Sequence, residues 1–177
     1  MGEEAKQELA IKVWLNGKEC ETGVDPGETL LELIRDRFGL TGVKRSCDME
    51  VCGACTVLLD GKPVSSCTTL AFEARDKKIL TIEGMAFNGK LHPIQEAFIE
   101  GGGFQCGFCT PGMILTAKAL LDENPDPSEG EIIEYMEGNL CRCTGYKMIV
   151  ESIKLAVEKM KESNRSGVAA MQSRKEG

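Results

Sequence analysis

The sequence predicts an α+β fold, with a small mixed sheet in the N-terminal half and a group of helices in the C-terminal half. Two patterns predict it. Up to Gly84, apolar and polar residues alternate in short runs that end at turn residues, as in half-buried strands. Beyond Gly84, apolar residues recur with the period of about 3.6 residues that marks one face of an α-helix. The 177 residues therefore suit two small domains.

The first domain opens with a hairpin and a capped helix. Residues 11–15 alternate as in a strand, and the Asn-Gly dipeptide at 16–17 is typical of a two-residue hairpin turn. Residues 19–24 should therefore return as the second strand. The sequence at 29–32 fits a capping box, with Thr first and Glu last, and we expect the helix that follows to end at Gly39.

Strands are predicted in the rest of this domain. Residues 56–59 form a third strand, the Asp-Gly pair at 60–61 turns the chain into residues 64–68, and residues 79–82 supply the last strand. A hairpin, a helix and further strands within about 80 residues indicate a β-grasp arrangement. We assign the first domain to residues 1–84.

Four helices are predicted in the second domain, at residues 93–99, 110–121, 128–138 and 147–161. Thr110 is expected to cap the second of these helices, because Pro111 then takes the first helical position. A second capping box, at Ser128, begins the third helix. We assign this four-helix domain to residues 85–162 and expect the polar tail at 163–177 to be disordered.

Composition and charge exclude several classes of protein. The formal charge of −7 disfavours a nucleic-acid binder, which usually has a basic face. No apolar run approaches the ~20 residues of a membrane span, and the N-terminus lacks the pattern of a signal peptide. We therefore expect a cytoplasmic protein, in which nine cysteines indicate metal or redox chemistry rather than disulfides. A single histidine, His92, cannot build a site that needs several imidazoles.

The first cysteine group has the spacing C-x4-C-x2-C of plant-type 2Fe-2S proteins. It comprises Cys47, Cys52 and Cys55, and Cys67 is expected to join it from the strand after the 60–61 turn. Small residues inside the loop allow backbone N–H groups to approach the sulfurs. A four-thiolate zinc site is the alternative, but zinc sites favour two short C-x2-C hooks and this group has one. The ninth cysteine, Cys20, is predicted to be a packed thiol.

The second cysteine group consists of two short pairs, Cys106 with Cys109 and Cys141 with Cys143. Each pair precedes a predicted helix, and the positive end of a helix dipole favours an anionic thiolate centre. That field would stabilise a zinc–thiolate site as well as an iron–sulfur cluster. Spacing alone leaves both possibilities open.

Three longer motifs resemble the iron–sulfur subunits of the xanthine oxidase and carbon monoxide dehydrogenase family of molybdenum hydroxylases. They are CGACTV at 52–57, GFQCGFCTPG at 103–112 and GNLCRCTGY at 138–146, and the resemblance covers residues 9–160 in the order of the family. It implies a plant-type ferredoxin domain followed by a helical 2Fe-2S domain. It also implies a cluster, rather than zinc, at the second group.

The resemblance further implies an electron relay without substrate chemistry on this chain, and so no catalytic residue. Electrons from a molybdopterin centre on a large subunit would pass to a proximal 2Fe-2S cluster and then to a distal one. The exit would be FAD on a medium subunit, in an (αβγ)2 assembly of heterotrimers. The implied proximal ligands are Cys106, Cys109, Cys141 and Cys143, and the implied distal ligands are Cys47, Cys52, Cys55 and Cys67. Gln105 and Cys143 are implied to contact the pterin.

The distal loop departs from the family's pattern. Many relatives have glycine before the first ligand and again within the x4 loop, where this chain has Ser46 and the residues 48–51. A left-handed backbone in that loop is then more costly.

Two other classes of function are weighed against the relay: a free-standing two-cluster ferredoxin-like carrier or redox sensor, and an interaction module stabilised by structural zinc. Neither the substrate nor the terminal electron acceptor is specified by this sequence.

Overall fold

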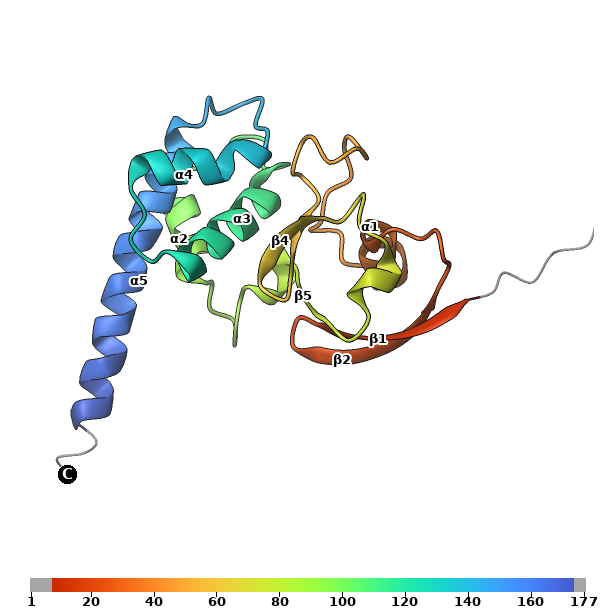
Figure 1. Cartoon of the computed structure of the whole chain (residues 1–177). Coiled ribbons are helices and arrows are strands. Elements are labelled where there is room, and N and C mark those ends of the chain that lie inside the picture. Colours follow the sequence, from red (N-terminus) through yellow and green to blue (C-terminus); the bar gives the residue numbers. More distant parts are fainter. Residues whose placement is uncertain (1–7, 174–177) are drawn as a thin grey trace, which may run out of the picture.

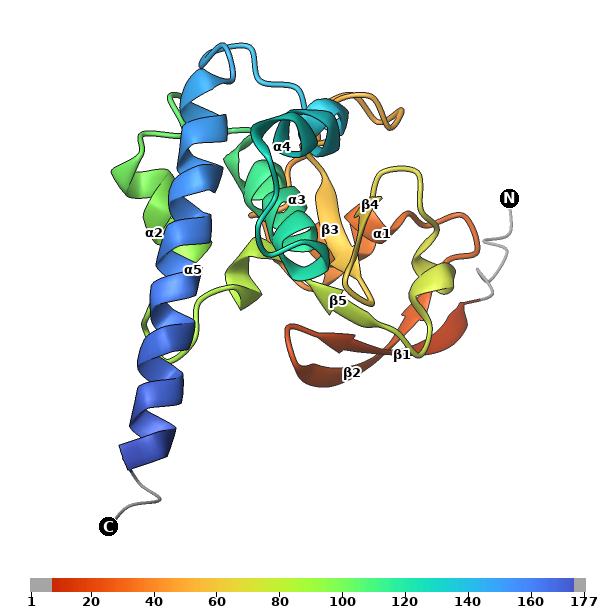
Figure 2. The same cartoon turned by 60° about the vertical axis from the view of Figure 1, so that its left-hand side comes forward.

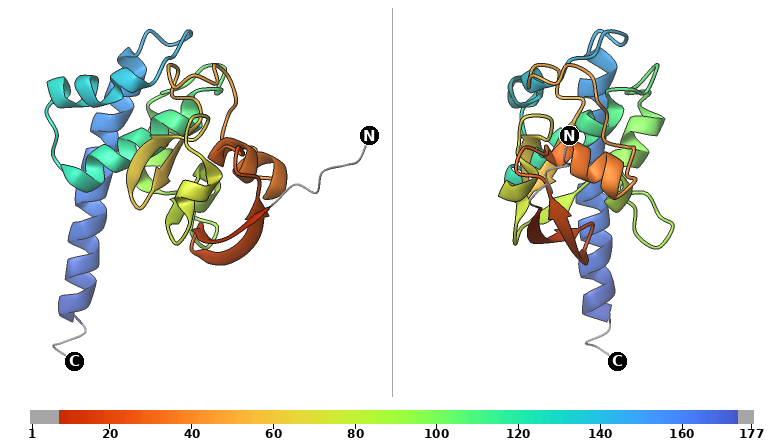
Figure 3. Two further views of the ribbon diagram at one scale, coloured as in Figure 1. Left: turned by 45° about the vertical axis from the view of Figure 1, so that its right-hand side comes forward. Right: turned by 90° about the vertical axis from the view of Figure 1, so that its right-hand side faces the viewer.

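The computed structural model describes residues 8–173, with side chains described through residue 163. A sheet domain and a helical domain lie side by side, and helix α3 (Thr110–Glu123) lies between the sheet and the long helix α5 (Lys147–Ser173) (Figures 1 and 2). The C-terminal part of α5 extends beyond the other elements in both views of Figure 3. The predicted α+β class is confirmed.

The sheet has five strands in the order β2-β1-β5-β3-β4. They are β1 (Leu9–Leu15), β2 (Lys18–Val24), β3 (Thr56–Leu59), β4 (Lys62–Ser65) and β5 (Lys78–Leu80). Strands β1 and β5 pair in parallel and the other neighbours are antiparallel. Helix α1 (Leu30–Glu32) continues as a π-helical turn to Arg37 and covers one face, which completes the β-grasp arrangement. The core between the helix and the sheet includes Val13, Leu31, Ile34, Val57 and Ile79.

Short-range sequence signals form as predicted. Asn16 and Gly17 both have positive φ, at 50° and 80°, as a type I′ hairpin turn requires. In the capping box, the Glu32 N–H donates to Thr29 Oγ1 at 3.2 Å, and Glu32 Oε2 accepts from the Thr29 N–H at 2.9 Å. Gly39 adopts φ +68°, in the left-handed region that favours glycine at a helix end.

Two strands end earlier than predicted, and both differences have a local cause. Strand β4 covers 62–65 rather than 64–68, because the N–H groups of Thr68 and Thr69 both donate to the Ser65 carbonyl and close a turn. Cys67 therefore lies in that turn and not on a strand. Strand β5 ends at Leu80 rather than at 82, because the Thr81 N–H donates to Asn16 Oδ1 and the chain enters a 3-10 turn at 82–84.

The helical domain contains α2 (Pro93–Glu100), α3, α4 (Glu129–Tyr135) with a 3-10 turn at 136–138, and α5. Its core includes Phe98, Met113, Leu115, Ile132 and Ile153. Strand β3 joins the two cores, since Val57 is buried in the sheet core and Leu58 in the helical one. The capping box at Ser128 is confirmed, with the Glu131 N–H donating to Ser128 Oγ.

Two helix ends differ from the prediction. Helix α3 is capped by Cys109 and not by Thr110, because the Cys109 carbonyl already accepts the Met113 N–H at 3.0 Å. Thr110 thus lies inside the first turn, and its hydroxyl is buried without a hydrogen-bond partner among the described residues. Helix α5 continues to Ser173 instead of ending at 161. The disorder predicted for 163–177 is therefore wrong as far as 173, where the backbone is helical, and residues 174–177 lie outside the described residues.

The free energy of unfolding should fall as the pH drops below about 6.5, the unfolded pKa of histidine, through the titration of His92. Its Nδ1 accepts the Ile94 N–H at 3.3 Å and caps α2, so the imidazole must be neutral. Burial, together with the Lys118 ammonium, lowers the pKa of His92. A depressed folded pKa gives stability that is present above the unfolded pKa and is lost on acidification.

Asparagine caps helices without titrating, so His92→Asn provides the matched control for this pH dependence. Thermal unfolding midpoints between pH 5.5 and 7.5 should fall more steeply for the wild type than for the variant. Parallel curves would contradict the assignment.

Candidate metal centres

The first cysteine group lies on the loop that leads into β3 and on the turn after β4. Cys55 and Cys67 are buried, whereas Cys47 and Cys52 are half-buried. The sulfurs are arranged in two contacting pairs: Cys47 Sγ with Cys52 Sγ, and Cys55 Sγ with Cys67 Sγ. The structure thus pairs Cys47 with Cys52 and Cys55 with Cys67, and their sharing of one centre stays a prediction.

The two pairs have different electrostatic surroundings. Backbone N–H groups of Met49 and Val51 donate toward Cys47 and lower the pKa of its thiol to about 6. Burial instead raises the pKa of Cys55 to about 11. Backbone donors thus stabilise negative charge at the half-buried Cys47–Cys52 pair, whereas the buried Cys55–Cys67 pair is shielded from water.

The loop between Cys47 and Cys52 contains two non-glycine residues in the left-handed backbone conformation, which the sequence analysis predicts to be costly there. Asp48 has φ 52° and Glu50 has φ 61°. Glu50 also accepts a hydrogen bond from the Thr68 hydroxyl at 3.2 Å, which ties the loop to the residue after Cys67. The strained backbone is thus held in place by its polar side chains.

The second cysteine group is formed by the loops that precede α3 and α5. Cys143 Sγ lies 3.6 Å from Cys106 Sγ, and both residues are exposed. Cys109 and Cys141 are half-buried and form the other contacting pair. Burial raises the pKa of Cys109 to about 12. Burial opposes ionisation of Cys141 too, but hydrogen bonds from Thr144 and from backbone N–H groups hold its pKa below the usual value.

A cavity of about 440 Å³ lies at the second group and reaches the first. Its wall is lined by Cys52, Ala54, Cys106, Cys109, Cys141 and Cys143, among other residues. It is open to solvent on the side of the exposed Cys106–Cys143 pair. The space between the sulfurs of the second group is therefore not filled by side chains.

Hydrogen bonds join the two groups directly. The Leu140 N–H donates to the Cys52 carbonyl at 2.9 Å, which connects the residue before Cys141 to a cysteine of the first group. Asn139 is buried and donates from Nδ2 to the Gly53 carbonyl at 3.0 Å, while its Oδ1 accepts from the Thr116 hydroxyl at 2.8 Å. Sequence reasoning gave Asn139 no role, although it lies within the 138–146 motif, because its partners Gly53 and Thr116 are distant in the sequence.

The paired sulfurs suit 2Fe-2S clusters, in which four thiolates are shared between two irons. Tetrahedral zinc instead needs its donors around one point. Among residues 8–173, no group of three or more His, Cys, Asp or Glu side chains has a geometry suited to one metal ion. Cys20 lies apart on β2, where its thiol faces the Lys18 carbonyl at 3.7 Å.

Comparison with known proteins identifies the chain. Residues 13–81 match the family described as a 2Fe-2S iron-sulfur cluster binding domain, and residues 81–154 match the [2Fe-2S] binding domain family. The nicotinate dehydrogenase small FeS subunit of Eubacterium barkeri is 51% identical over 151 residues, which are 85% of this chain and 96% of that one. The chain belongs to the iron–sulfur subunits of the molybdenum hydroxylase family.

Two further relatives agree with this assignment. The nicotine 6-hydroxylase small subunit of Paenarthrobacter nicotinovorans is 48% identical over 145 residues, covering 82% of this iron–sulfur subunit and 87% of the relative. A chain in the crystal structure of quinoline 2-oxidoreductase from Pseudomonas putida 86 superposes with a TM-score of 0.84 at 44% identity. The match covers 88% of the subunit and 98% of that chain.

The predicted class of function is confirmed. The iron–sulfur subunit has two 2Fe-2S domains and transfers electrons within a multi-subunit oxidoreductase, and a free-standing carrier is not favoured. No helix within residues 8–173 combines the length and apolar character needed to cross a membrane. Cytoplasmic location stays a prediction.

Proposed function

We propose that the subunit passes electrons from a molybdopterin centre on a large partner to FAD on a medium partner, in an (αβγ)2 assembly. The proximal cluster would be held by Cys106, Cys109, Cys141 and Cys143, and the distal cluster by Cys47, Cys52, Cys55 and Cys67. When bound, the clusters supply one-electron carriers. The thiolates of this chain hold them, and its backbone N–H groups stabilise the negative charge.

The hydrogen bond from Leu140 to Cys52 is the observation that carries this proposal. The donor, Leu140, is covalently bonded to Cys141 of the second group, and the acceptor is the backbone carbonyl of Cys52 in the first group. This one hydrogen bond therefore links the two cysteine groups. Buried Asn139 holds the same segment against Gly53. Two redox centres fixed so closely in one rigid contact support a relay better than two independent sites.

The exposed rim of the second group supports its place at the entry of the relay. Cys143 and Gln105 are both exposed beside Cys106, as a contact with the pterin of a partner requires. Phe104 and Phe108 lie two residues before and two residues after Cys106 in the chain and are 41% and 47% exposed. Exposed aromatic residues near a redox centre are typical of a subunit interface. We further propose that the boundary between the two domains lies between residues 84 and 85.

The test is the metal content and spectrum of the purified complex. We expect enough iron and acid-labile sulfide for two 2Fe-2S clusters per chain, two distinct EPR signals after reduction by dithionite, and two larger chains that copurify. Zinc in place of iron, or a single cluster signal, would overturn the ligand assignment. An iron-loaded chain that purifies alone and has no affinity for a pterin-bearing subunit would overturn the assembly.

A further inference from the structure

The residues after Cys141 form a closed ring of hydrogen bonds around that cysteine. The Thr144 hydroxyl donates to Cys141 Sγ at 3.1 Å. The Tyr146 N–H donates to Thr144 Oγ1 at 3.2 Å. The Cys141 N–H donates to the Tyr146 hydroxyl at 2.9 Å. Three residues thus fix the surroundings of one sulfur.

The ring determines where the Thr144 proton points. A hydroxyl has one proton and two acceptor sites. Since one acceptor site of Thr144 Oγ1 receives the Tyr146 N–H, the proton is free to be directed at the Cys141 sulfur. The turn that allows this places both Gly145 and Tyr146 at positive φ, 64° and 68°. A non-glycine residue in this region is costly, so Tyr146 must be held there by other contacts.

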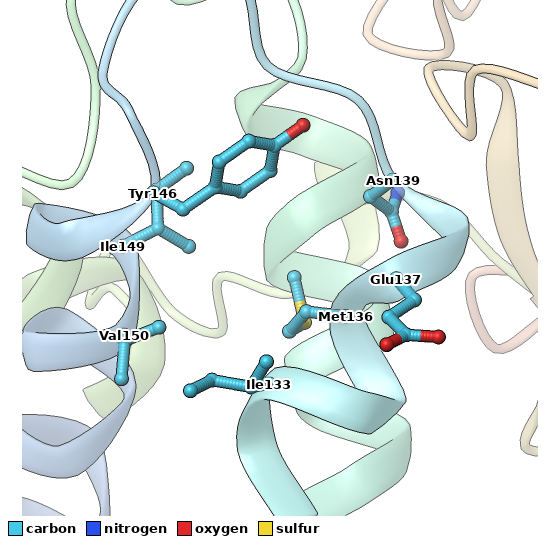
Figure 4. A pocket seen from close by; sticks show the side chains of 7 residues that line it. All are labelled: Ile133, Met136, Glu137, Asn139, Tyr146, Ile149 and Val150. Carbon is cyan, nitrogen blue, oxygen red and sulfur yellow. The ribbon is translucent and has the colours of Figure 1, made fainter. Parts of the chain in front are cut away.

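An apolar pocket anchors Tyr146. The pocket has a volume of about 290 Å³ and lies between the 3-10 turn after α4 and the start of α5. Figure 4 shows the Tyr146 ring above Ile149, Val150 and Met136, with its hydroxyl directed toward the chain at Asn139. Tyr146 is 37% exposed, so most of its surface is covered by its neighbours. Tyr146 therefore connects this apolar pocket to the Thr144 hydroxyl, which donates to the Cys141 sulfur.

We propose that Thr144 is a positioning residue that sets the reduction potential of the second cluster through its hydrogen bond to Cys141. The inference rests on the proposed role of Cys141 as a cluster ligand. Reduction adds negative charge to the cluster and its thiolates, and a donor to a thiolate stabilises that charge. The Thr144 hydroxyl therefore raises the potential of this cluster, and its removal lowers it. Among the described residues, the Thr144 side chain bonds to Cys141 and Tyr146 and to none of the four proposed distal ligands, so the distal cluster would serve as an internal reference.

The experiment compares Thr144→Val with Thr144→Ser in the purified holo-complex. Valine keeps the shape and removes the hydroxyl, whereas serine keeps the hydroxyl. EPR-monitored potentiometry gives the midpoint of each cluster separately. We expect Thr144→Val to lower the midpoint of the second cluster by up to about 59 mV, which is tenfold in a one-electron equilibrium. Thr144→Ser should retain the wild-type midpoint, and the distal midpoint should stay fixed in both variants.

Three results would overturn the proposal while leaving the relay intact: an unchanged second midpoint in Thr144→Val, equal shifts with valine and serine, or a joint shift of both clusters. If Thr144→Val does not retain its iron, Thr144→Ala, which removes the hydroxyl without adding bulk, is measured in its place. Failure of the ligand assignment looks different, because the wild-type complex would then lack one of the two cluster signals before any substitution is made.

Discussion

Replacing Cys109 by serine should remove one 2Fe-2S cluster from the subunit and leave the other in place. Cys109 is half-buried and contacts Cys141, so its loss breaks one of the two sulfur pairs of the second group. A serine oxygen is a harder donor than the thiolate that iron–sulfur clusters select. We expect iron and labile sulfide per chain to fall by half, with one EPR signal lost and the flow of electrons to the acceptor abolished.

Cys20→Ser provides the matched control for this substitution. Cys20 lies on β2, outside both cysteine groups, where it packs against the sheet core and its thiol lies 3.7 Å from the Lys18 carbonyl. The control should retain full iron, both signals and activity. If Cys20→Ser loses iron as Cys109→Ser does, the assignment of eight ligands among the nine cysteines is wrong.

Gly53→Ala should destabilise the contact between the two cysteine groups. Gly53 is buried with φ +65°, and an added Cβ would lie 2.6 Å from Asn139 Nδ2 and clash with the Gly138 carbonyl. We expect roughly 2–5 kcal/mol of lost stability from the left-handed backbone and the overpacking together. Thermal unfolding of the holo-protein measures it, and the rate of electron transfer between the clusters should fall as the Leu140–Cys52 bond is displaced.

Gly17→Ala separates the two causes. Gly17 has φ +80° but nothing lies within 4 Å of an added Cβ, so this variant carries the backbone cost alone, roughly 1–2 kcal/mol. It lies in the hairpin between β1 and β2, away from both cysteine groups. Equal losses of stability in Gly53→Ala and Gly17→Ala would show that the close approach at Gly53 has no energetic weight.

Features encoded within a few residues were predictable from the sequence. The turn at Asn16-Gly17 and the capping boxes at Thr29 and Ser128 depend on bonds between residues that are at most three positions apart, and all three formed as expected. The predicted C-terminal end of β4 and the predicted N-cap of α3 were wrong. Each depends on which of several nearby carbonyls accepts a given backbone N–H, and the residue types do not specify that choice. Cys67 was consequently placed on a strand although it lies in a turn.

The centres were predictable in composition but not in arrangement. Motif spacing named the eight cysteines, and the structure places the four of the second group around one cavity and those of the first group in two pairs. Spacing did not show that the sulfurs form pairs, nor that Leu140 and Asn139 bond to the loop at 52–53 across 86 positions of sequence between Gly53 and Asn139. Contacts of such range follow from the packing of α3 against β3 and β4, which no local pattern encodes.

The exposure of Cys106 and Cys143 also imposes an order on biogenesis. These two residues form the open side of the cavity at the second group, whereas Cys109 and Cys141 lie deeper. Among the described residues, this rim is the exposed part of the second group, so we expect iron and sulfide to reach the site across it. The same rim is the face we assign to the large partner. We therefore expect the proximal cluster to be assembled before the subunit docks.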